Sequence, residues 1–161
     1  MLYNIATMDD IDLKLIDVLQ IDGRASNTEL AKKLGISEAT VRRRIHNLIS
    51  TGTITITAVP EPYKIGYKTM AFIGVNVQLS EINNVAKKLT SYPQVHYVGL
   101  CSGSTDIFAW VLFRSPEELS DFVTNELSAI PGIIRTDTII QLKLLKRTLG
   151  HLQFNNSWTE Q

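Results

Sequence analysis

The stretch SNTELAKKLGISEATVRRRIHNLISTGTI, residues 26–54, predicts two short helices joined by a tight turn at residues 34–36. Ser26 and Glu29 have the spacing of a capping box, in which each side chain accepts the backbone N–H of the other residue. Ser37 stands directly before the second helix as an N-cap. Two helices that meet across a glycine-bearing turn form a helix-turn-helix, whose second helix can enter the major groove of DNA.

The second helix of this motif has an apolar face and a polar face. At about 100° per residue, Val41, Ile45, Leu48 and Ile49 form the apolar face, and Arg44 lies near its boundary. The opposite face carries cationic and hydrogen-bonding groups with almost no acid. Arginine suits guanine edges or phosphates, asparagine suits adenine edges, and hydroxyls suit either. We expect DNA contacts at Ser26, Asn27, Ser37, Glu38, Ala39, Thr40, Arg42, Arg43, Arg44, His46 and Asn47.

A solvated basic helix surface is the alternative interpretation, but the caps, the turn, the apolar spacing and the exposed chemistry agree on DNA binding. The 161-residue chain has a formal net charge of zero, so the basic residues are a local feature. Residues 30–52 hold five Lys and Arg against Glu38 alone, and five Asp between residues 9 and 22 offset them. A small patch on a neutral chain predicts a small DNA footprint per subunit and a need for two or more copies.

Composition excludes several classes of protein and site. The hydrophobic content of 44% suits a soluble globular protein. No apolar run approaches the roughly 20 residues that cross a membrane. The first residues lack the basic start and apolar run of a signal peptide, so a cytoplasmic protein is expected. Cys101 is the only cysteine, which excludes intrachain disulfides and thiolate zinc sites. We expect no cofactor.

The N-terminal half predicts a three-helix unit over residues 1–52. Asp9 or Asp10 can cap a first helix that runs to about Gln20 and is ended by Gly23. After the helix-turn-helix, TITITAV (53–59) alternates in polarity and predicts a half-buried strand, which would make the motif winged. PEPYKIGY (60–67) has two prolines and a glycine, so residues 53–68 are expected to be a strand and hinge connector.

Residues 69–150 predict a second domain with the order βαββαβ, the ferredoxin-like plan of an α+β fold. Strands are expected at 69–79, 95–101, 106–113 and 133–146. Ser80 is a candidate cap for the first helix, and Ser115 with Glu118 predicts a capping box for the second. Residues 151–161 have weak periodicity and are treated as a separate tail.

One strand of this domain, DIFAWVLF (106–113), is apolar on both faces. Because both helices of a ferredoxin-like unit lie on one side of the sheet, the other side needs a cover. We infer that the sheet of a second subunit supplies it, with the connector or the tail as the alternative. A dimer also supplies a second DNA-reading helix for a two-fold-related half-site.

The chain resembles the leucine-responsive/asparagine-operon regulator (Lrp/AsnC) family of prokaryotic transcription factors over residues 8–147. The resemblance rests on residues 9–54, on PYKIGY (62–67), on GSTD (103–106) and on RTDTIIQL (135–142), in this order. It implies an N-terminal helix-turn-helix that binds double-stranded DNA. It also implies an amino-acid-sensing ferredoxin-like module, and homodimers that associate into higher oligomers such as octamers.

The resemblance also implies an effector site between subunits, at the turn Gly103-Ser104-Thr105-Asp106. Gly103 permits a close backbone approach, and Asp106 can pair with an α-ammonium group. A plain hairpin turn is the alternative, since Gly, Ser and Asp are common in turns. The expected ligand-binding residues are Leu100, Cys101, Gly103, Ser104, Thr105, Asp106, Thr136 and Thr138.

Two other functions are alternatives to a DNA-binding regulator: an enzyme, and a module that does not bind DNA. The sirohaem decarboxylases share this two-domain layout and place functional basic residues in the second strand, where His96 lies. However, the three histidines have no ligand spacing, and neither a nucleophile motif nor a P-loop is present. A sensor or assembly module without DNA binding is the other option. The basic second helix and the GSTD turn favour a DNA-binding regulator over both.

Overall fold

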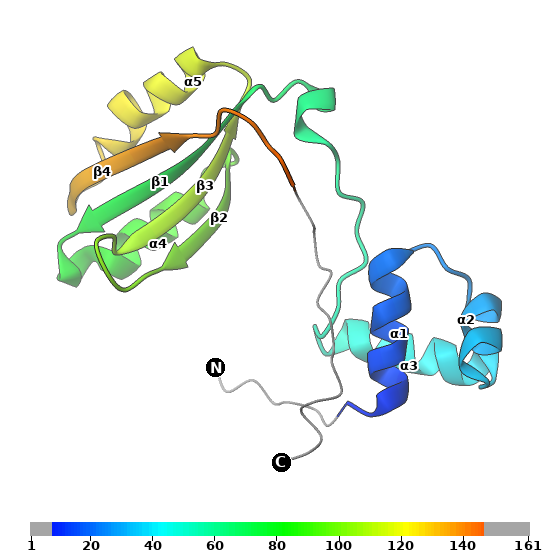
Figure 1. Cartoon of the computed structure of the whole chain (residues 1–161). Helices are drawn as coiled ribbons and strands as arrows, with labels where there is room; N and C mark the ends of the chain where they lie inside the picture. The colour runs from blue at the N-terminus through cyan, green and yellow to red at the C-terminus, as the bar shows by residue number, and fades with distance from the viewer. Residues whose placement is uncertain (1–7, 147–161) are drawn as a thin grey trace. The chain divides into compact units, whose positions relative to one another are not determined.

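The computed structural model describes residues 8–146, which form two compact units (Figure 1). The helix-turn-helix unit runs up to Val59, and the sheet unit spans Pro60–Leu145. The division falls inside the segment 53–68 that we expected to be a connector. The expected tail, 151–161, lies outside the described residues. Among residues 8–146, no helix combines the length and the apolarity that a membrane span requires.

The helix-turn-helix unit consists of α1 (Asp10–Ile21), α2 (Asn27–Leu34) and α3 (Glu38–Ser50). Leu15, Leu30 and Val41, one from each helix, meet in its core with at most 1% exposure. Burial of a leucine or valine side chain contributes about 1.5–3 kcal/mol. These contacts hold the helices together, and they confirm the inner faces predicted around Leu30 and Val41.

The predicted caps of the helix-turn-helix are present. The backbone N–H of Ser26 donates to Glu29 Oε2 at 2.8 Å, and that of Glu29 donates to Ser26 Oγ at 3.2 Å. The Ser26 N–H and, next, the Ser26 hydroxyl, which donates to Glu29 Oε2 at 2.8 Å, hold the pKa of Glu29 below its ordinary value. Ser37 Oγ accepts the N–H of Thr40 at 3.2 Å and so begins α3. Gly35 ends α2 with a φ of 68°, a conformation that favours glycine.

The start of α1 is tied to α3 by Arg44. Asp9 caps α1 and accepts the N–H groups of Ile11 and Asp12, both at 3.0 Å. Arg44 Nη1 donates to one carboxylate oxygen of Asp9 and one of Asp12, each at 2.9 Å. The bond from the Asp12 backbone and the bond from Arg44 lower the pKa of Asp9. The guanidinium therefore joins the two helices at the end where α1 begins.

Two expectations for this unit were wrong. Residues 53–59 contain no strand, so the wing predicted from TITITAV is wrong: this segment pairs with none of the strands that residues 8–146 form. Ile49, expected on the inner face of α3, is 45% exposed. It lies in the last turn of the helix, beyond the region that α1 and α2 cover.

The sheet unit has the predicted βαββαβ order. Its strands form one antiparallel sheet in the order β2-β3-β1-β4, so β1 is central and pairs with both β3 and β4. A short 3-10 turn (Pro62–Ile65) precedes the sheet. The elements are β1 (Thr69–Val77), α4 (Ile82–Thr90), β2 (Val95–Leu100), β3 (Ile107–Phe113), α5 (Pro116–Asp121) and β4 (Ile133–Ile140).

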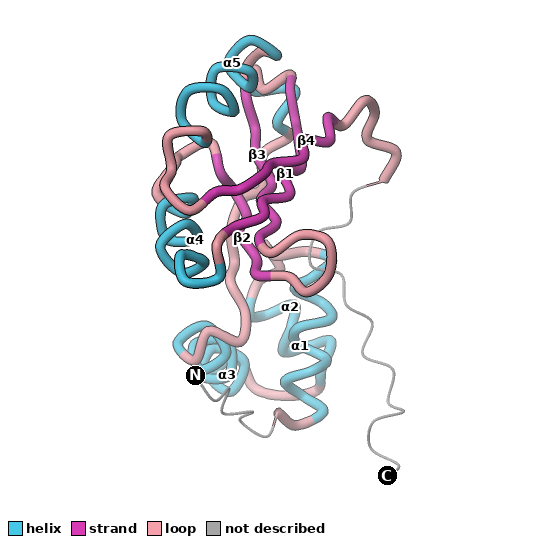
Figure 2. The backbone as a smooth tube through the Cα atoms, turned by 90° about the vertical axis from the view of Figure 1, so that its left-hand side faces the viewer, coloured by secondary structure: helices cyan, strands magenta, loops and turns pink. Residues whose placement is uncertain are grey.

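Both helices cover the same face of the sheet, which we call the helix face (Figure 2). Ile73 and Val75 of β1 pack there against Val85 of α4 and Phe122, all with at most 1% exposure. The second helix does not remain α-helical. After Asp121 it continues as a π-helical turn, η3 (Phe122–Leu127), which the sequence pattern did not predict.

Two boundaries in this unit differ from the prediction. β4 ends at Ile140 rather than at residue 146. Ile140 pairs with Ala71, and one further bond, from the N–H of Gln141 to the carbonyl of Met70 at 2.9 Å, lies close to the start of β1 at Thr69. Ser80 does not cap α4. It lies inside a 3-10 turn, η2 (Leu79–Glu81), and the helix starts after Glu81 without a side-chain cap. Half of the predicted capping box at Ser115 is present, since its Oγ accepts the N–H of Glu118 at 3.3 Å. The other half differs, because Glu118 Oε2 accepts the N–H of Arg114 at 2.8 Å instead of that of Ser115.

The other side of the sheet, the open face, carries apolar side chains with no helix over them in the sheet unit. Phe72 and Phe108 stack there with ring centroids 5.6 Å apart. Tyr97, on the same side, is 57% exposed. Trp110 Nε1 is buried, yet it has no hydrogen-bond partner in the part of the chain that the structure describes. This agrees with the predicted need for a cover.

We expect Arg44→Met to lower the melting temperature of the helix-turn-helix unit by about 5 °C at neutral pH, because Asp12 loses its cation. The lowered pKa of Asp9 contributes stability above its ordinary value of 3.8, and this contribution is lost as the pH falls below that value. The variant should therefore show a smaller loss of stability below pH 4. Circular-dichroism melts across pH 2–7 measure this, with the exposed Arg42→Met as control. Equal melting temperatures for the two variants would contradict the role of Arg44.

Candidate functional site

The exposed surface of α3 presents a compact group of candidate DNA contacts. Ala39, Arg42, Arg43 and His46 are all exposed, and their spacing of three, four and seven residues puts them on one side of the helix. None of the four side chains forms a hydrogen bond or an ion pair within residues 8–146. We call these four residues the reading face. Its two arginines are free to meet phosphates or guanine edges.

The remaining candidates on the helix-turn-helix divide into two groups. Glu38 and Asn47 are exposed beside the reading face, and Asn47 and Arg43 border a shallow groove of about 270 Å³. The hydroxyls of Ser26, Ser37 and Thr40 are engaged in helix caps, so they are less available to DNA, and Asn27 is half-buried.

Arg44 is the one arginine of α3 that is not available to contact DNA. We had expected it among the DNA contacts, but only 19% of its side chain is exposed and its guanidinium is bound to Asp9 and Asp12. Its position about 100° from Arg43 on the helix turns it toward α1. The helical periodicity puts Arg44 at the boundary of the apolar face of α3. Periodicity within one helix cannot indicate that two carboxylates at the start of another helix lie beside it.

The turn between β2 and β3, residues 101–106, is fastened to the central strand. The N–H of Asp106 donates to the carbonyl of Val75 at 3.2 Å, and Asp106 Oδ2 accepts the N–H of Val77 at 2.9 Å. The Asp106 carboxylate thus extends the hydrogen bonding between β1 and β3 by one step past Ile107, where β3 begins. Its second oxygen, Oδ1, has no hydrogen-bond partner in the described chain and can accept a bond from a bound ammonium.

Gly74 and Asn76 of β1 seat the turn on the open face. A Cβ at Gly74 would lie 2.9 Å from Thr105 Oγ1 and 3.2 Å from its Cγ2, so only glycine leaves room for Thr105. Asn76 Nδ2 donates to the carbonyl of Ser104 at 2.8 Å. Sequence reasoning missed both residues. The glycine inside a strand was a signal of close approach that could have identified Gly74.

The structure brings together only some of the expected effector residues. Leu100 and Cys101 are exposed where β2 ends, next to Gly103, Ser104, Thr105 and Asp106. Thr136 and Thr138 lie opposite Val75 and Ile73, whose side chains are in the helix-face core, so they point away from the turn. Asp137, opposite Gly74, is the β4 residue on the side of the turn.

His96, the candidate for the enzymatic alternative, lies in an aromatic cluster. Its ring is 6.0 Å from that of Trp110 and 6.5 Å from that of Tyr67. No group of three or more His, Cys, Asp or Glu side chains within residues 8–146 is placed to hold a metal ion.

Two protein-family models match the chain in the order of its two units. The AsnC-type helix-turn-helix domain matches residues 8–49, and the Lrp/AsnC ligand-binding domain matches residues 70–150. Relatives include the HTH-type transcriptional regulator FL11 of Pyrococcus horikoshii, 37% identical over 142 residues, with 88% of this chain and 93% of the relative covered. LrpA of the same organism is 35% identical over 140 residues, with 86% and 99% covered.

Solved structures agree with these matches over the whole fold. AsnC of E. coli superposes with a TM-score of 0.81 at 28% identity, covering 89% of this chain and 99% of the other. The complex of the transcriptional regulator NMB0573 of Neisseria meningitidis with L-Met has a TM-score of 0.83 at 26% identity, with 91% and 97% covered.

We expect Gly74→Ala to destabilise the sheet unit by about 1–3 kcal/mol, the usual cost of overpacking. The added methyl group would collide with Thr105 and displace the turn. Thr105→Ala removes both close atoms, so the double variant Gly74→Ala/Thr105→Ala should recover most of the lost stability. Urea unfolding of the wild type, both single variants and the double variant measures this coupling. Additive effects of the two substitutions would show that Gly74 does not seat the turn.

Proposed function

Because the chain belongs to the Lrp/AsnC family of transcriptional regulators, we propose that Ala39, Arg42, Arg43 and His46 of α3 read double-stranded DNA. The observation that carries the proposal is the exposure of these four side chains on one side of the second helix of a helix-turn-helix. Asn47 and Glu38 flank them, and the backbone at the capped start of α2, with Ser26 and Asn27, is placed to meet phosphates. Prokaryotic DNA lies in the cytoplasm, where we propose that the protein acts.

The DNA-binding form is a homodimer or a larger assembly of dimers. The open face supports dimer formation, since half-buried Phe72 and Phe108, exposed Tyr97 and the unpartnered N–H of Trp110 lie on one surface. A facing sheet would bury the rings and can supply an acceptor to Trp110. Two copies would also double a reading face that is small in each chain.

The effector is a small molecule, and we propose an amino acid that binds beside the turn 103–106. Oδ1 of Asp106 can accept a bond from the α-ammonium group, while Ser104 and the backbone of Gly103 can approach the α-carboxylate. Leu100, Cys101 and Thr105 are close enough in the chain to contribute. The L-Met complex of the Neisseria meningitidis regulator supports this class of ligand.

Regulation follows from where this turn lies. It rests on the open face at Gly74 and Asn76, so a ligand bound there would touch the surface that we propose to be covered by a second subunit. A ligand that prefers one assembly shifts the population toward it. The spacing of the paired α3 helices would change with the assembly. The named relatives are transcriptional regulators, and we propose this class rather than an enzyme.

We expect Arg43→Ala to weaken binding to an operator by about 1–3 kcal/mol per half-site. The matched control is Arg24→Ala, an exposed arginine that precedes α2. Gel-shift titrations at several salt concentrations, on DNA selected with the wild-type protein, measure both. The proposal fails if the two variants bind with equal affinity.

Substitutions at Asp106 separate its two roles. Asp106→Asn keeps an oxygen for the N–H of Val77 but loses the charge, so it should retain the fold and bind the effector about tenfold or more weakly. Asp106→Ala loses both functions and should also be less stable. A thermal-shift screen of the twenty amino acids identifies a ligand for the wild type, and calorimetry compares the variants. Unchanged affinity in Asp106→Asn would exclude the carboxylate from the site.

A further inference from the structure

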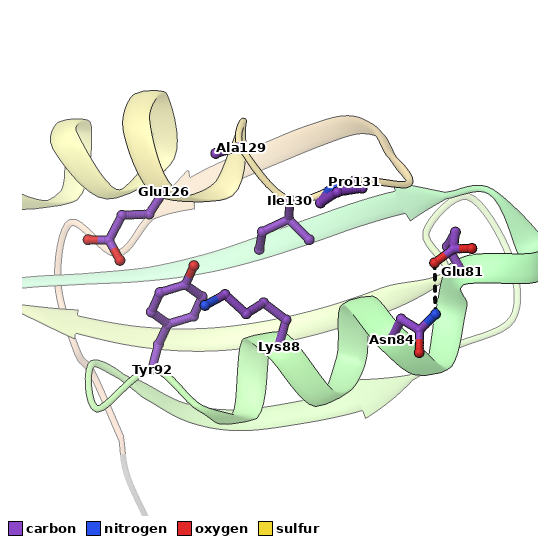
Figure 3. Close-up of a pocket in the computed structure, with 8 residues that line it drawn as sticks. All are labelled: Glu81, Asn84, Lys88, Tyr92, Glu126, Ala129, Ile130 and Pro131. Atoms are coloured by element: carbon purple, nitrogen blue, oxygen red, sulfur yellow. Dashed lines mark hydrogen bonds between the residues drawn. The ribbon is translucent and has the colours of Figure 1, made fainter.

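A second candidate site lies on the helix face of the sheet unit, in a groove between α4 and the segment that follows η3 (Figure 3). The groove has a volume of about 450 Å³, within the range of small-molecule sites. It lies on the opposite side of the sheet from the open face, so a subunit packed on the open face would leave it accessible. Its walls are Glu81, Asn84, Lys88, Tyr92, Glu126, Ala129, Ile130 and Pro131.

One end of the groove brings opposite charges together. Lys88 Nζ lies 4.8 Å from the centre of the Tyr92 ring, and Glu126 projects toward the same ring from the facing segment (Figure 3). Within residues 8–146, the ammonium of Lys88 and the carboxylate of Glu126 form no ion pair or hydrogen bond. An ammonium and a carboxylate that share a groove without pairing are complementary to a zwitterion.

The π-helical turn η3 carries Glu126 to this position. π-Helical turns are rare and occur frequently at functional sites. Phe122 and Leu127, at the two ends of the turn, remain buried with at most 1% exposure, so the irregular backbone presents Glu126 without disturbing the core. Phe122 also holds Tyr92 in an edge-to-face contact at 5.1 Å.

The other end of the groove holds a third charge, the carboxylate of Glu81. Asn84 Nδ2 donates to Glu81 Oε2 at 2.8 Å and orients it. The backbone at Gly132 makes room for this side chain, because a Cβ there would lie 2.5 Å from Glu81 Cβ and 2.8 Å from its Cγ. Gly132 also has a φ of 92°, which other residues rarely adopt.

We propose that this groove binds a basic α-amino acid. Lys88 meets the α-carboxylate, Glu126 meets the α-ammonium group, and Glu81 meets the cation at the end of the side chain. Glu81 directly precedes α4 and Lys88 is seven residues further along the chain, a rise of about 10 Å, which suits the extended side chain of lysine or arginine. Ile130 and Pro131 form an apolar wall for its methylene groups. Two carboxylates and one ammonium match a ligand with a net charge of +1.

This site is distinct from the effector site proposed at residues 103–106 and does not depend on it. Isothermal titration calorimetry of the full chain with L-lysine, L-arginine and L-norleucine tests it, since norleucine keeps the carbon chain of lysine without the terminal ammonium. We expect saturable binding of lysine or arginine, and weaker binding of norleucine. Binding should persist in Asp106→Asn, which alters only the other site.

The groove variants should each lose a defined part of the recognition. Lys88→Met and Glu126→Gln should weaken binding of the basic amino acid about tenfold or more, whereas the matched control Lys87→Met, outside the groove on the same helix, should not. Glu81→Gln should reduce the preference for lysine over norleucine. Circular-dichroism melts check that each variant is folded.

Three results would overturn the proposal. The first is no saturable binding of lysine or arginine to the wild type, and the second is equal affinity for lysine and norleucine. The third is binding that is lost in Asp106→Asn but kept in Lys88→Met and Glu126→Gln, which would place the ligand at the turn and leave the proposed function standing. Loss of binding in the groove variants alone supports the groove and says nothing against the turn.

Discussion

The alternation of side chains along β1 is the constraint on which the sheet unit depends. This strand pairs on both edges, so its backbone is committed and successive residues must point to opposite faces. Ile73 and Val75 face the helices and are almost completely buried. Gly74 and Asn76 face the other way and seat the turn after β2. A single strand therefore supports the core on one side and the proposed effector turn on the other.

In the helix-turn-helix unit, the distribution of charges limits how many cationic side chains are available to DNA. The chain is neutral as a whole. Of the three consecutive arginines of α3, Arg44 forms ion pairs with Asp9 and Asp12. Only Arg42 and Arg43 remain on the reading face. A patch this small offers few counterion-releasing contacts in one copy, and the homodimer that we propose would double them.

Most of the architecture followed from local signals that are strong in this chain. The caps at Ser26 and Ser37 and the βαββαβ order were predicted because capping residues and hydrophobic periodicity act over a few positions. The errors arose where a distant partner decides the outcome. The segment expected to be a strand at 53–59 pairs with no strand of the described chain. Arg44 meets carboxylates more than 30 residues away, and Thr136 and Thr138 face the helices because of their register with β1. The π-helical turn has no simple sequence pattern, so Glu126 could not be placed from the sequence.

In α3, the residues that stabilise the fold are different from those exposed on the reading face, and this separation has a consequence for evolution. Ser37 and Thr40 begin the helix, Arg44 ties it to α1, and Val41 and Leu48 fill the core, so substitutions at these positions carry a folding cost. Ala39, Arg42, Arg43 and His46 hold nothing else in place within the described chain. Mutation can therefore change these four positions with little loss of stability, and paralogues that arise by gene duplication can diverge on the proposed reading face while keeping one scaffold.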